Sequence, residues 1–417
     1  MNYKEIKSGI SNASYLTLAS VISTLIGLAG MIYITRILGP HDYGIYLTVL
    51  AFVHFFGVFS LGGLNKVLTR EGSKDIKNVK VILENAVFIR SFFTIFATLL
   101  CLLSVFFTDY EPTLKFLIMI YSLDLLFEHF SSFLNTIFQI FEKMKYMAVI
   151  SIIFRIFLTS SFVILLHLGY GVFEMVIANL LSHFLGFLVS LYFTRKFAKI
   201  NLFKGITDVR FDYFKPALIF SGIGFFISIA LKIDNLMISF LGNSTEVGLY
   251  GPASNMATFG NTIRSYVAFA FFPVIVKYTE SSRFNTAILI KYSTILLFFS
   301  ISICIIMSYF AIDLFVYLFT DDFRFSGEIF RILVFFICFT WATLPYTIFA
   351  QAKGHEVLIL KIYFLMAILN IVLNIFFYNI YGLIGIAYST ICVYGFGSIA
   401  QCILIHQKLS LDIAKNA

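Results

Sequence analysis

Charged side chains are scarce in this sequence. Asp, Glu, Lys and Arg make up only 12% of the 417 residues, whereas soluble domains carry about 25%. Hydrophobic residues reach 60%, and the mean hydropathy is +0.93. A soluble chain of this length would not have enough polar side chains to cover its surface. We therefore expect a protein whose surroundings are lipid.

Cysteine is also rare and carries no ligand pattern. The five cysteines all lie in apolar runs, without a Cys-x-x-Cys spacing or a paired histidine. We therefore expect neither disulfides nor a metal site. The first apolar run, residues 15–35, is longer than a signal-peptide core and lacks a small-residue cleavage site. We expect this run to remain in the protein as a membrane helix.

Long apolar runs follow one another along the chain. A helix needs about 20 residues to cross the hydrocarbon core, and membrane-spanning strands would show alternating polarity, which these runs lack. The sequence predicts an all-α membrane protein with twelve transmembrane helices, at residues 15–35, 44–64, 81–107, 113–141, 147–168, 171–193, 216–241, 247–276, 286–309, 327–352, 357–377 and 382–405. Residues 311–325 either extend the ninth helix or lie along the membrane interface.

The positive charges orient this topology. Five Lys and Arg follow the second predicted helix, and six lie in residues 195–215. The opposite side has only Arg36, Lys115, Arg324 and Arg331. Because Lys and Arg favour cytoplasmic loops, we expect a multi-pass membrane protein with both termini in the cytoplasm. The basic residues are scattered through short loops, so the net charge of +8 indicates contact with anionic lipids and not with nucleic acid.

A short pattern occurs once in each half of the chain. Leu-Gly is followed by four or five residues and then by Gly-x-Tyr, in ITRILGPHDYGIY and again in MISFLGNSTEVGLY. Six predicted helices per half give two parallel repeats. We expect an N-terminal lobe at 1–194, a cytoplasmic linker at 195–215 and a C-terminal lobe at 216–417. This organisation is typical of transporters with a substrate path between the halves.

The same segments resemble a known family. RILGPHDYGIY, KIDNLMISFLGNSTEVGLYGPAS and YGLIGIAYST are similar to the polysaccharide-biosynthesis flippases, the Wzx-type O-antigen transporters of the multidrug/oligosaccharidyl-lipid/polysaccharide exporter superfamily. The resemblance implies two six-helix lobes that form a V-shaped central cavity and work by alternating access. It implies transport of an undecaprenyl-diphosphate-linked oligosaccharide from the cytoplasmic to the periplasmic leaflet of the bacterial inner membrane. It also implies a polymerase and a chain-length regulator of the same pathway as partners.

Four cations lie within predicted spans, namely Arg90, Arg155, Lys232 and Arg264. A charge at mid-bilayer costs about 2.5–3.5 kcal/mol, so such residues face a protein interior or water. A diphosphate carries about two negative charges, and guanidinium groups match phosphate oxygens with paired hydrogen bonds. We expect Arg90 and Arg155 to receive the diphosphate near the cytoplasmic side, and Lys232 and Arg264 to hold it mid-membrane. The alternative is that these cations pair with carboxylates and hold helices together.

Three carboxylates also lie within predicted spans. Asp124 and Glu128 are four residues apart and therefore share a helix face. They form a candidate coupling site for Na⁺, or for a proton if one carboxyl has a raised pKa. The alternative is that a neighbouring cation satisfies Glu128. We expect the third carboxylate, Asp234, to contact Arg264.

Three amides, Asn255, Asn261 and Gln139, are candidate sugar contacts. Other function classes fit the sequence less well. An O-antigen polymerase or ligase would carry a long outside loop for its chemistry, and no DxD or HExxH pattern occurs, so we expect no enzyme and no cofactor. A multidrug exporter of the same superfamily remains the nearer alternative, although it would favour an acidic cavity over several Arg and Lys.

Overall fold

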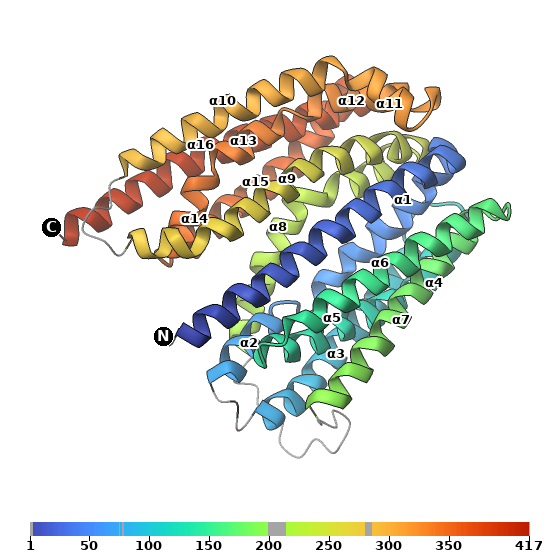
Figure 1. The fold of residues 1–417 in the computed structure, drawn as a ribbon. Coiled ribbons are helices and arrows are strands. Elements are labelled where there is room, and N and C mark those ends of the chain that lie inside the picture. Colours follow the sequence, from blue (N-terminus) through green and yellow to red (C-terminus); the bar gives the residue numbers. More distant parts are fainter. Residues whose placement is uncertain (1–2, 75, 77–78, 199–213, 280–285, 417) are drawn as a thin grey trace. The chain divides into compact units, whose positions relative to one another are not determined.

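Every regular element that the structure describes is a helix. The computed structural model describes residues 3–74, 76, 79–198, 214–279 and 286–416. The first helices are α1 (Tyr3–Gly57), the 3-10 turn η1 (Val58–Ser60), α2 (Leu64–Lys74), α3 (Val79–Val105), α4 (Pro112–Tyr121), α5 (Asp124–Ile140), α6 (Met144–His167), α7 (Val172–Ala198) and α8 (Phe214–Leu241). They are followed by α9 (Ser244–Thr279), α10 (Ala287–Tyr309), α11 (Ala311–Leu318), η3 (Asp321–Phe323), α12 (Arg324–Leu333), α13 (Phe336–Ala342), α14 (Leu344–Ala352), α15 (Glu356–Tyr381) and α16 (Leu383–Asn416) (Figure 1).

The chain divides into two compact units. Unit 1 comprises Met1–Leu38 and Ile45–Phe225, and unit 2 comprises Gly39–Gly44 and Phe226–Ala417. Helix α8 therefore contributes to both units. The predicted lobes and linker stay a prediction, and residues 199–213 of that linker lie outside the described part of the chain.

Nine helices in the described residues are long and apolar enough to cross a membrane. These candidate spans are Thr17–Ser60, Val79–Val105, Pro112–Ile140, Met144–His167, Val172–Lys196, Ala287–Tyr309, Asp321–Ala352, Val357–Tyr381 and Leu383–Leu411. The predicted total of twelve is not confirmed. It counts Thr17–Ser60 as two helices and includes α8 and α9, which are not among the nine.

Helix α1 bends at Gly39, where the backbone has φ 71° and ψ 175°. Glycine reaches a positive φ at little cost because it has no Cβ. Pro40 follows it and lacks the N–H that a continuous helix requires. The bend separates the two segments in which the first two transmembrane helices were predicted.

The glycines of the repeated pattern meet within unit 2. A Cβ on Gly44 would overlap the carbonyl oxygen of Ser244, and a Cβ on Gly248 would overlap the carbonyl oxygen of Pro40. The backbone of segment Gly39–Gly44 therefore lies directly against the start of α9. Only glycine at both positions permits this close approach.

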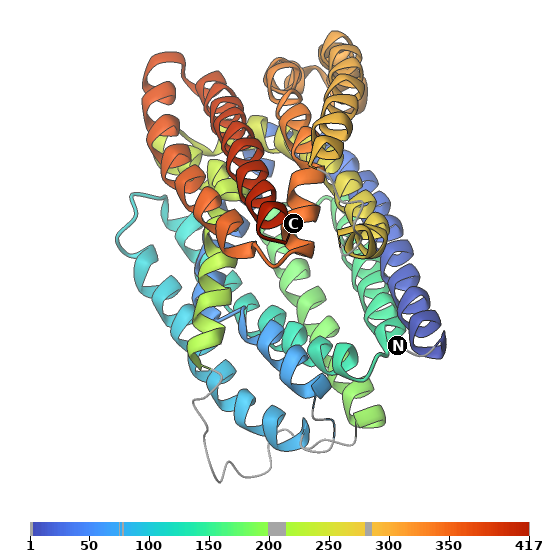
Figure 2. The same ribbon diagram turned by 90° about the vertical axis from the view of Figure 1, so that its left-hand side faces the viewer.

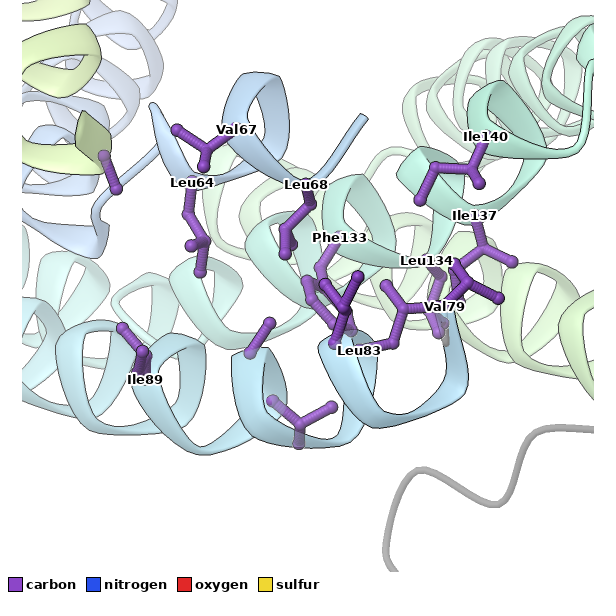
Figure 3. Close-up of a cluster of buried hydrophobic side chains, with 14 of the residues drawn as sticks. Leu64, Val67, Leu68, Val79, Leu83, Ile89, Phe133, Leu134, Ile137 and Ile140 are labelled. Carbon is purple, nitrogen blue, oxygen red and sulfur yellow. The ribbon is translucent and has the colours of Figure 1, made fainter. Parts of the chain in front are cut away.

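A hydrophobic core joins α2, α3 and α5 in unit 1 (Figure 3). Helix α2 presents Leu64, Val67 and Leu68 to this core, at the spacing that places residues on one face of a helix. Its opposite face is polar, and with 11 residues α2 is too short to cross a bilayer. The segment that sequence analysis treated as a basic loop is thus an amphipathic helix.

The helices of unit 2 are interrupted at more places than the sequence predicts. Helix α10 ends at Tyr309, and α11 and η3 occupy most of residues 311–325 as separate short elements, so this segment does not extend α10. The helix predicted at 327–352 is divided into α12, α13 and α14, and Pro345 lies in the first turn of α14. In contrast, α15 and α16 are long and lie side by side (Figures 1 and 2).

Candidate functional site

A buried carboxylate organises the polar residues of unit 1. Asp124 is the first residue of α5 and is fully buried. Its Oδ1 accepts a hydrogen bond from Nδ1 of His183 in α7. The His183 ring stacks on Phe154 of α6, with ring centroids 4.6 Å apart and planes 8° apart. Helices α6 and α7 thus hold the histidine that orients Asp124.

The second oxygen of Asp124 faces His54 of α1. The His54 Nε2 lies 3.7 Å from Asp124 Oδ2 and 3.8 Å from Glu128 Oε2. The side chains of His54 and Glu128 are 42% and 44% exposed, whereas Asp124 Oδ2 is buried and has no hydrogen-bond partner in the described structure. Asp124 and Glu128, which were predicted to share a helix face, therefore converge on one histidine.

Arg90 is enclosed by neutral groups. It lies in α3, is fully buried, and donates from Nη1 to the carbonyl oxygen of Ser60 at 2.8 Å and from Nη2 to Asn65 Oδ1. The carbonyls at a helix C-terminus lack intrahelical donors, and a cation there is favourable. Arg90 therefore links the end of η1 to the start of α2, and its guanidinium is not accessible to a ligand in this structure.

Arg155 of α6 is packed against the backbone of α1. A Cβ on Gly27 would lie 3.1 Å from Arg155 Nη1 and 3.2 Å from its Cζ. Gly27 thus provides space for the guanidinium. Arg155 is partly exposed, and within the described ranges its Nε has no hydrogen-bond partner and no carboxylate forms an ion pair with it.

Asp234 organises the corresponding network in unit 2. Tyr250 Oη of α9 donates to Asp234 Oδ2 at 2.8 Å, Thr390 Oγ1 of α16 donates to the same oxygen at 3.0 Å, and Asn374 Nδ2 of α15 donates to Oδ1 at 2.9 Å. The expected contact with Arg264 is wrong. Asp234 instead joins α8 to three other helices through uncharged donors.

Arg264 and Asn261 lie one turn apart on α9 and meet the same residue of α13. Arg264 Nε donates to the carbonyl oxygen of Thr340 at 2.6 Å, and the Thr340 hydroxyl donates to Asn261 Oδ1 at 2.6 Å. Lys232 and Asn255 are exposed, and Lys232 forms no ion pair with any residue that the structure describes. The structure thus brings one predicted cation and one predicted amide together.

The remaining predicted amide has a structural contact. Gln139 Oε1 accepts a hydrogen bond from Thr69 Oγ1 at 3.1 Å, which links α5 to α2. A cavity of about 700 Å³ lies in unit 2, and its lining is mostly apolar, including Ile312, Phe335 and Ile391. The described residues that line it include none of the predicted site residues, so the cavity does not coincide with the polar networks.

His54, Asn374 and Thr390 were not predicted as site residues, and neither was the role of Tyr250 as a partner of Asp234. His54 could have been found, because it interrupts the apolar run AFVHFFG. Asn374 repeats Asn370 after four residues in another apolar run, and the two amides share a hydrogen bond of 3.1 Å. Tyr250 is the tyrosine of the repeated Gly-x-Tyr pattern, but that pattern does not indicate its contact with Asp234. Thr390 carries no comparable signal, since threonine is frequent throughout the chain.

The fold of the chain is similar to that of solved membrane proteins. The chain is similar to the lipid II flippase MurJ in its inward closed conformation, with a TM-score of 0.78 and 17% identity over 96% of this chain and 90% of that chain. It is also similar to an inward-facing multidrug resistance MATE family transporter of the MOP superfamily, with a TM-score of 0.75 and 16% identity over 95% and 96% of the two chains. At this identity the likeness concerns the fold alone.

Sequence comparison gives the family. No curated protein matches the chain. Residues 10–279 match the family described as "Polysaccharide biosynthesis protein", and this match covers more than half of the chain. The protein therefore belongs to the polysaccharide biosynthesis protein family.

Proposed function

We propose that this protein is a flippase for undecaprenyl-diphosphate-linked O-antigen units. It moves the saccharide from the cytoplasmic to the periplasmic leaflet of the bacterial inner membrane by alternating access, with both of its termini in the cytoplasm. A polymerase and a chain-length regulator of the same pathway would use the product. The family match and the likeness in fold to a lipid II flippase support this proposal.

One structural observation carries the proposal. Within the described residues, none of Arg90, Arg155, Lys232 and Arg264 forms an ion pair with a carboxylate. The alternative, in which these cations hold helices together through ion pairs, has no support in this arrangement. Because unneutralised cations are costly in a membrane, an anionic substrate that neutralises Arg155, Lys232 and Arg264 during transport explains their presence.

The cations have different roles in this proposal. Arg155 in unit 1 and Arg264 in unit 2 retain guanidinium nitrogens that can donate to phosphate oxygens, and Lys232 adds a single exposed charge. Arg90 is committed to Ser60 and Asn65 and acts as a brace. Each charge-assisted hydrogen bond to a phosphate contributes about 1.5–3 kcal/mol, so each donor has a measurable effect on substrate affinity.

The amides and carboxylates complete the proposal. Asn261 lies beside Arg264 and is a candidate to contact the first sugar, with Asn255 and Gln139 as further candidates. Coupling to H⁺ or Na⁺ through Asp124 and Glu128 stays a prediction. It requires that transport in vesicles responds to an imposed proton or sodium gradient, and transport that is indifferent to both gradients would exclude it.

A vesicle assay tests the proposed substrate. The full-length protein is reconstituted into liposomes that contain a fluorescent polyprenyl-diphosphate oligosaccharide, and translocation is read from the accessibility of the sugar to an external lectin. We expect faster translocation than in protein-free vesicles. We also expect slower translocation after Arg155→Ala or Arg264→Ala, and no change after Arg195→Ala, which removes an exposed arginine in the last turn of α7.

The second candidate function is multidrug export. It is favoured by the likeness to one inward-facing MATE family transporter, whose TM-score of 0.75 is close to the 0.78 for the lipid II flippase. The same vesicles, loaded with a cationic dye, separate the two candidates. Dye export without movement of the lipid-linked saccharide would replace the flippase proposal by the export function.

A further inference from the structure

We propose that His54, Asp124 and Glu128 form a binding site for one divalent transition-metal ion, of the class of Zn²⁺, in unit 1. The ligand atoms of these three residues all lie within 4.8 Å of one another. They come from α1 and from two residues one turn apart on α5. This arrangement goes beyond the coupling site for H⁺ or Na⁺, because it includes a nitrogen ligand.

The distances fit ligands of a common ion better than they fit hydrogen bonds. His54 Nε2 lies 3.7 Å from Asp124 Oδ2 and 3.8 Å from Glu128 Oε2, whereas a nitrogen–oxygen hydrogen bond spans about 2.7–3.2 Å. With metal–ligand bonds of about 2.1 Å, two ligands of a tetrahedral ion lie about 3.4 Å apart. A small closure of the three side chains would therefore complete the coordination.

An orphaned oxygen provides independent support. Asp124 is fully buried, and its Oδ2 has no hydrogen-bond partner in the described structure. Leaving a buried carboxylate oxygen unsatisfied is costly. The other oxygen is held by His183, which fixes the carboxylate so that Oδ2 points towards His54 and Glu128. A metal ion would supply the missing partner, with His183 as the residue that orients its ligand.

The ligand types select the class of ion. Na⁺, Mg²⁺ and Ca²⁺ prefer sites made of oxygen atoms alone, whereas one imidazole and two carboxylates suit divalent transition metals. Three protein ligands leave a fourth position open. The exposure of His54 and Glu128 makes this position accessible, and, if the proposed function holds, a diphosphate oxygen of the substrate would occupy it.

Metal titration of the full-length protein tests the site. The tag is removed, the protein is treated with chelator, and Co²⁺ is added while its visible absorption is followed, with Zn²⁺ as competitor. We expect one Co²⁺ per chain with a tetrahedral spectrum, and displacement by Zn²⁺ but not by excess Na⁺. His54→Ala and Glu128→Gln each remove one ligand, and we expect each to weaken binding by more than about tenfold, since even the loss of an outer-shell partner costs about 10–100-fold in affinity.

Matched variants separate ligands from general effects. His167→Ala and Glu111→Gln remove an exposed histidine and an exposed glutamate elsewhere in unit 1, and we expect both to bind Co²⁺ like the parent. His183→Phe keeps a ring on Phe154 but removes the donor to Asp124. We expect this variant to bind Co²⁺ about 10–100-fold more weakly. Because the substitution also leaves the Asp124 carboxylate without its donor, we expect the metal-free variant to unfold at a lower temperature than the parent, and Co²⁺ binding is measured below that temperature.

Several outcomes would overturn the proposal. They are the absence of stoichiometric Co²⁺ binding, binding that survives the combined His54→Ala and Glu128→Gln substitutions, and displacement by Na⁺. If Co²⁺ did not bind stoichiometrically, the role of His54 would be to balance the charge of the two carboxylates. Because the titration contains no lipid substrate, stoichiometric Co²⁺ binding by a protein that moves no saccharide would refute the proposed function and leave the metal site standing.

Discussion

The two units satisfy an interior carboxylate in different ways, Asp124 being fully buried and Asp234 partly buried. Asp234 in unit 2 accepts hydrogen bonds on both oxygens from three uncharged side chains. Asp124 in unit 1 has a donor on one oxygen only, and the other faces a histidine that is too distant for a hydrogen bond. The difference indicates that Asp234 joins helices, whereas Asp124 is placed to receive a ligand.

The repeated pattern shows the same contrast. Its tyrosines, Tyr46 and Tyr250, each contribute a buried hydroxyl to the unit in which they lie. Tyr46 Oη accepts from Asn179 Nδ2 at 2.8 Å, and Tyr250 Oη donates to Asp234 at 2.8 Å. The equivalent position therefore meets a neutral partner in unit 1 and a carboxylate in unit 2.

The largest expected effect comes from removing the carboxylate of unit 2. Asp234→Ala removes the shared acceptor of Tyr250, Asn374 and Thr390 among packed helices. Asn374 and Thr390 keep a second acceptor each, on Asn370 and on the Ile386 carbonyl. Since a hydrogen bond to a charged group contributes about 1.5–3 kcal/mol, we expect the free energy of unfolding in detergent to fall by more than about 3 kcal/mol. Thermal unfolding followed by circular dichroism measures this loss.

Asp124→Ala is the matched variant in unit 1, and it removes the acceptor of a single hydrogen-bond donor, His183. We expect a smaller loss of stability than for Asp234→Ala. Equal losses for the two variants would mean that both carboxylates are structural, and the contrast between the units would then be wrong.

The next largest expected loss of stability comes from a steric clash where Gly44 contacts Ser244. Gly44→Ala places a methyl group on the carbonyl oxygen of Ser244, and overpacking of this kind costs about 1–3 kcal/mol. Gly62→Ala is the control, because a Cβ there meets no atom within 4 Å. We expect the first substitution to lower the unfolding temperature and the second to leave it unchanged. If Gly44→Ala were neutral, the close backbone contact would not exist in the folded protein.

Arginine substitutions sharpen the comparison of the cations. Arg155→Ala removes a guanidinium with no ion-pair partner in the described structure, so we expect translocation to slow by about tenfold or more, the equivalent of about 1.4 kcal/mol, with stability nearly unchanged. Arg90→Ala removes a brace from Ser60 and Asn65, and we expect a loss of stability as well. The vesicle assay and thermal unfolding, measured on the same preparations, separate the two patterns. A stability loss in Arg155→Ala as large as in Arg90→Ala would contradict the assignment.

The smallest expected effect is the difference in stability loss between two tyrosine variants, Tyr46→Phe and Tyr250→Phe. Tyr46→Phe removes a hydrogen bond between neutral groups, which contributes about 1 kcal/mol, whereas Tyr250→Phe removes one to a carboxylate, which contributes about 1.5–3 kcal/mol. Chemical unfolding curves of the two variants measure the difference. A larger loss for Tyr46→Phe than for Tyr250→Phe would reverse the contrast between the units.

The positions of most membrane helices can be predicted from the sequence, but only part of the candidate site can. The membrane helices follow from apolar runs, and the convergence of Asp124 and Glu128 follows from helical spacing. The partners of Arg90 and Arg264 could not be predicted, because each arginine donates to a backbone carbonyl, which any residue provides. The approach of His54 to Asp124 depends on how α1 packs against α5, and sequence spacing within one helix contains no information on that contact.

The central claim is that Arg155, Lys232 and Arg264 recognise a diphosphate. Two lipids that share the same polyprenyl chain and oligosaccharide, one joined through a diphosphate and one through an uncharged glycosidic bond, test it most directly in the vesicle assay. We expect the protein to move the diphosphate-linked lipid and to leave the uncharged lipid at the rate of protein-free vesicles. Equal protein-dependent rates for the two lipids would contradict the claim.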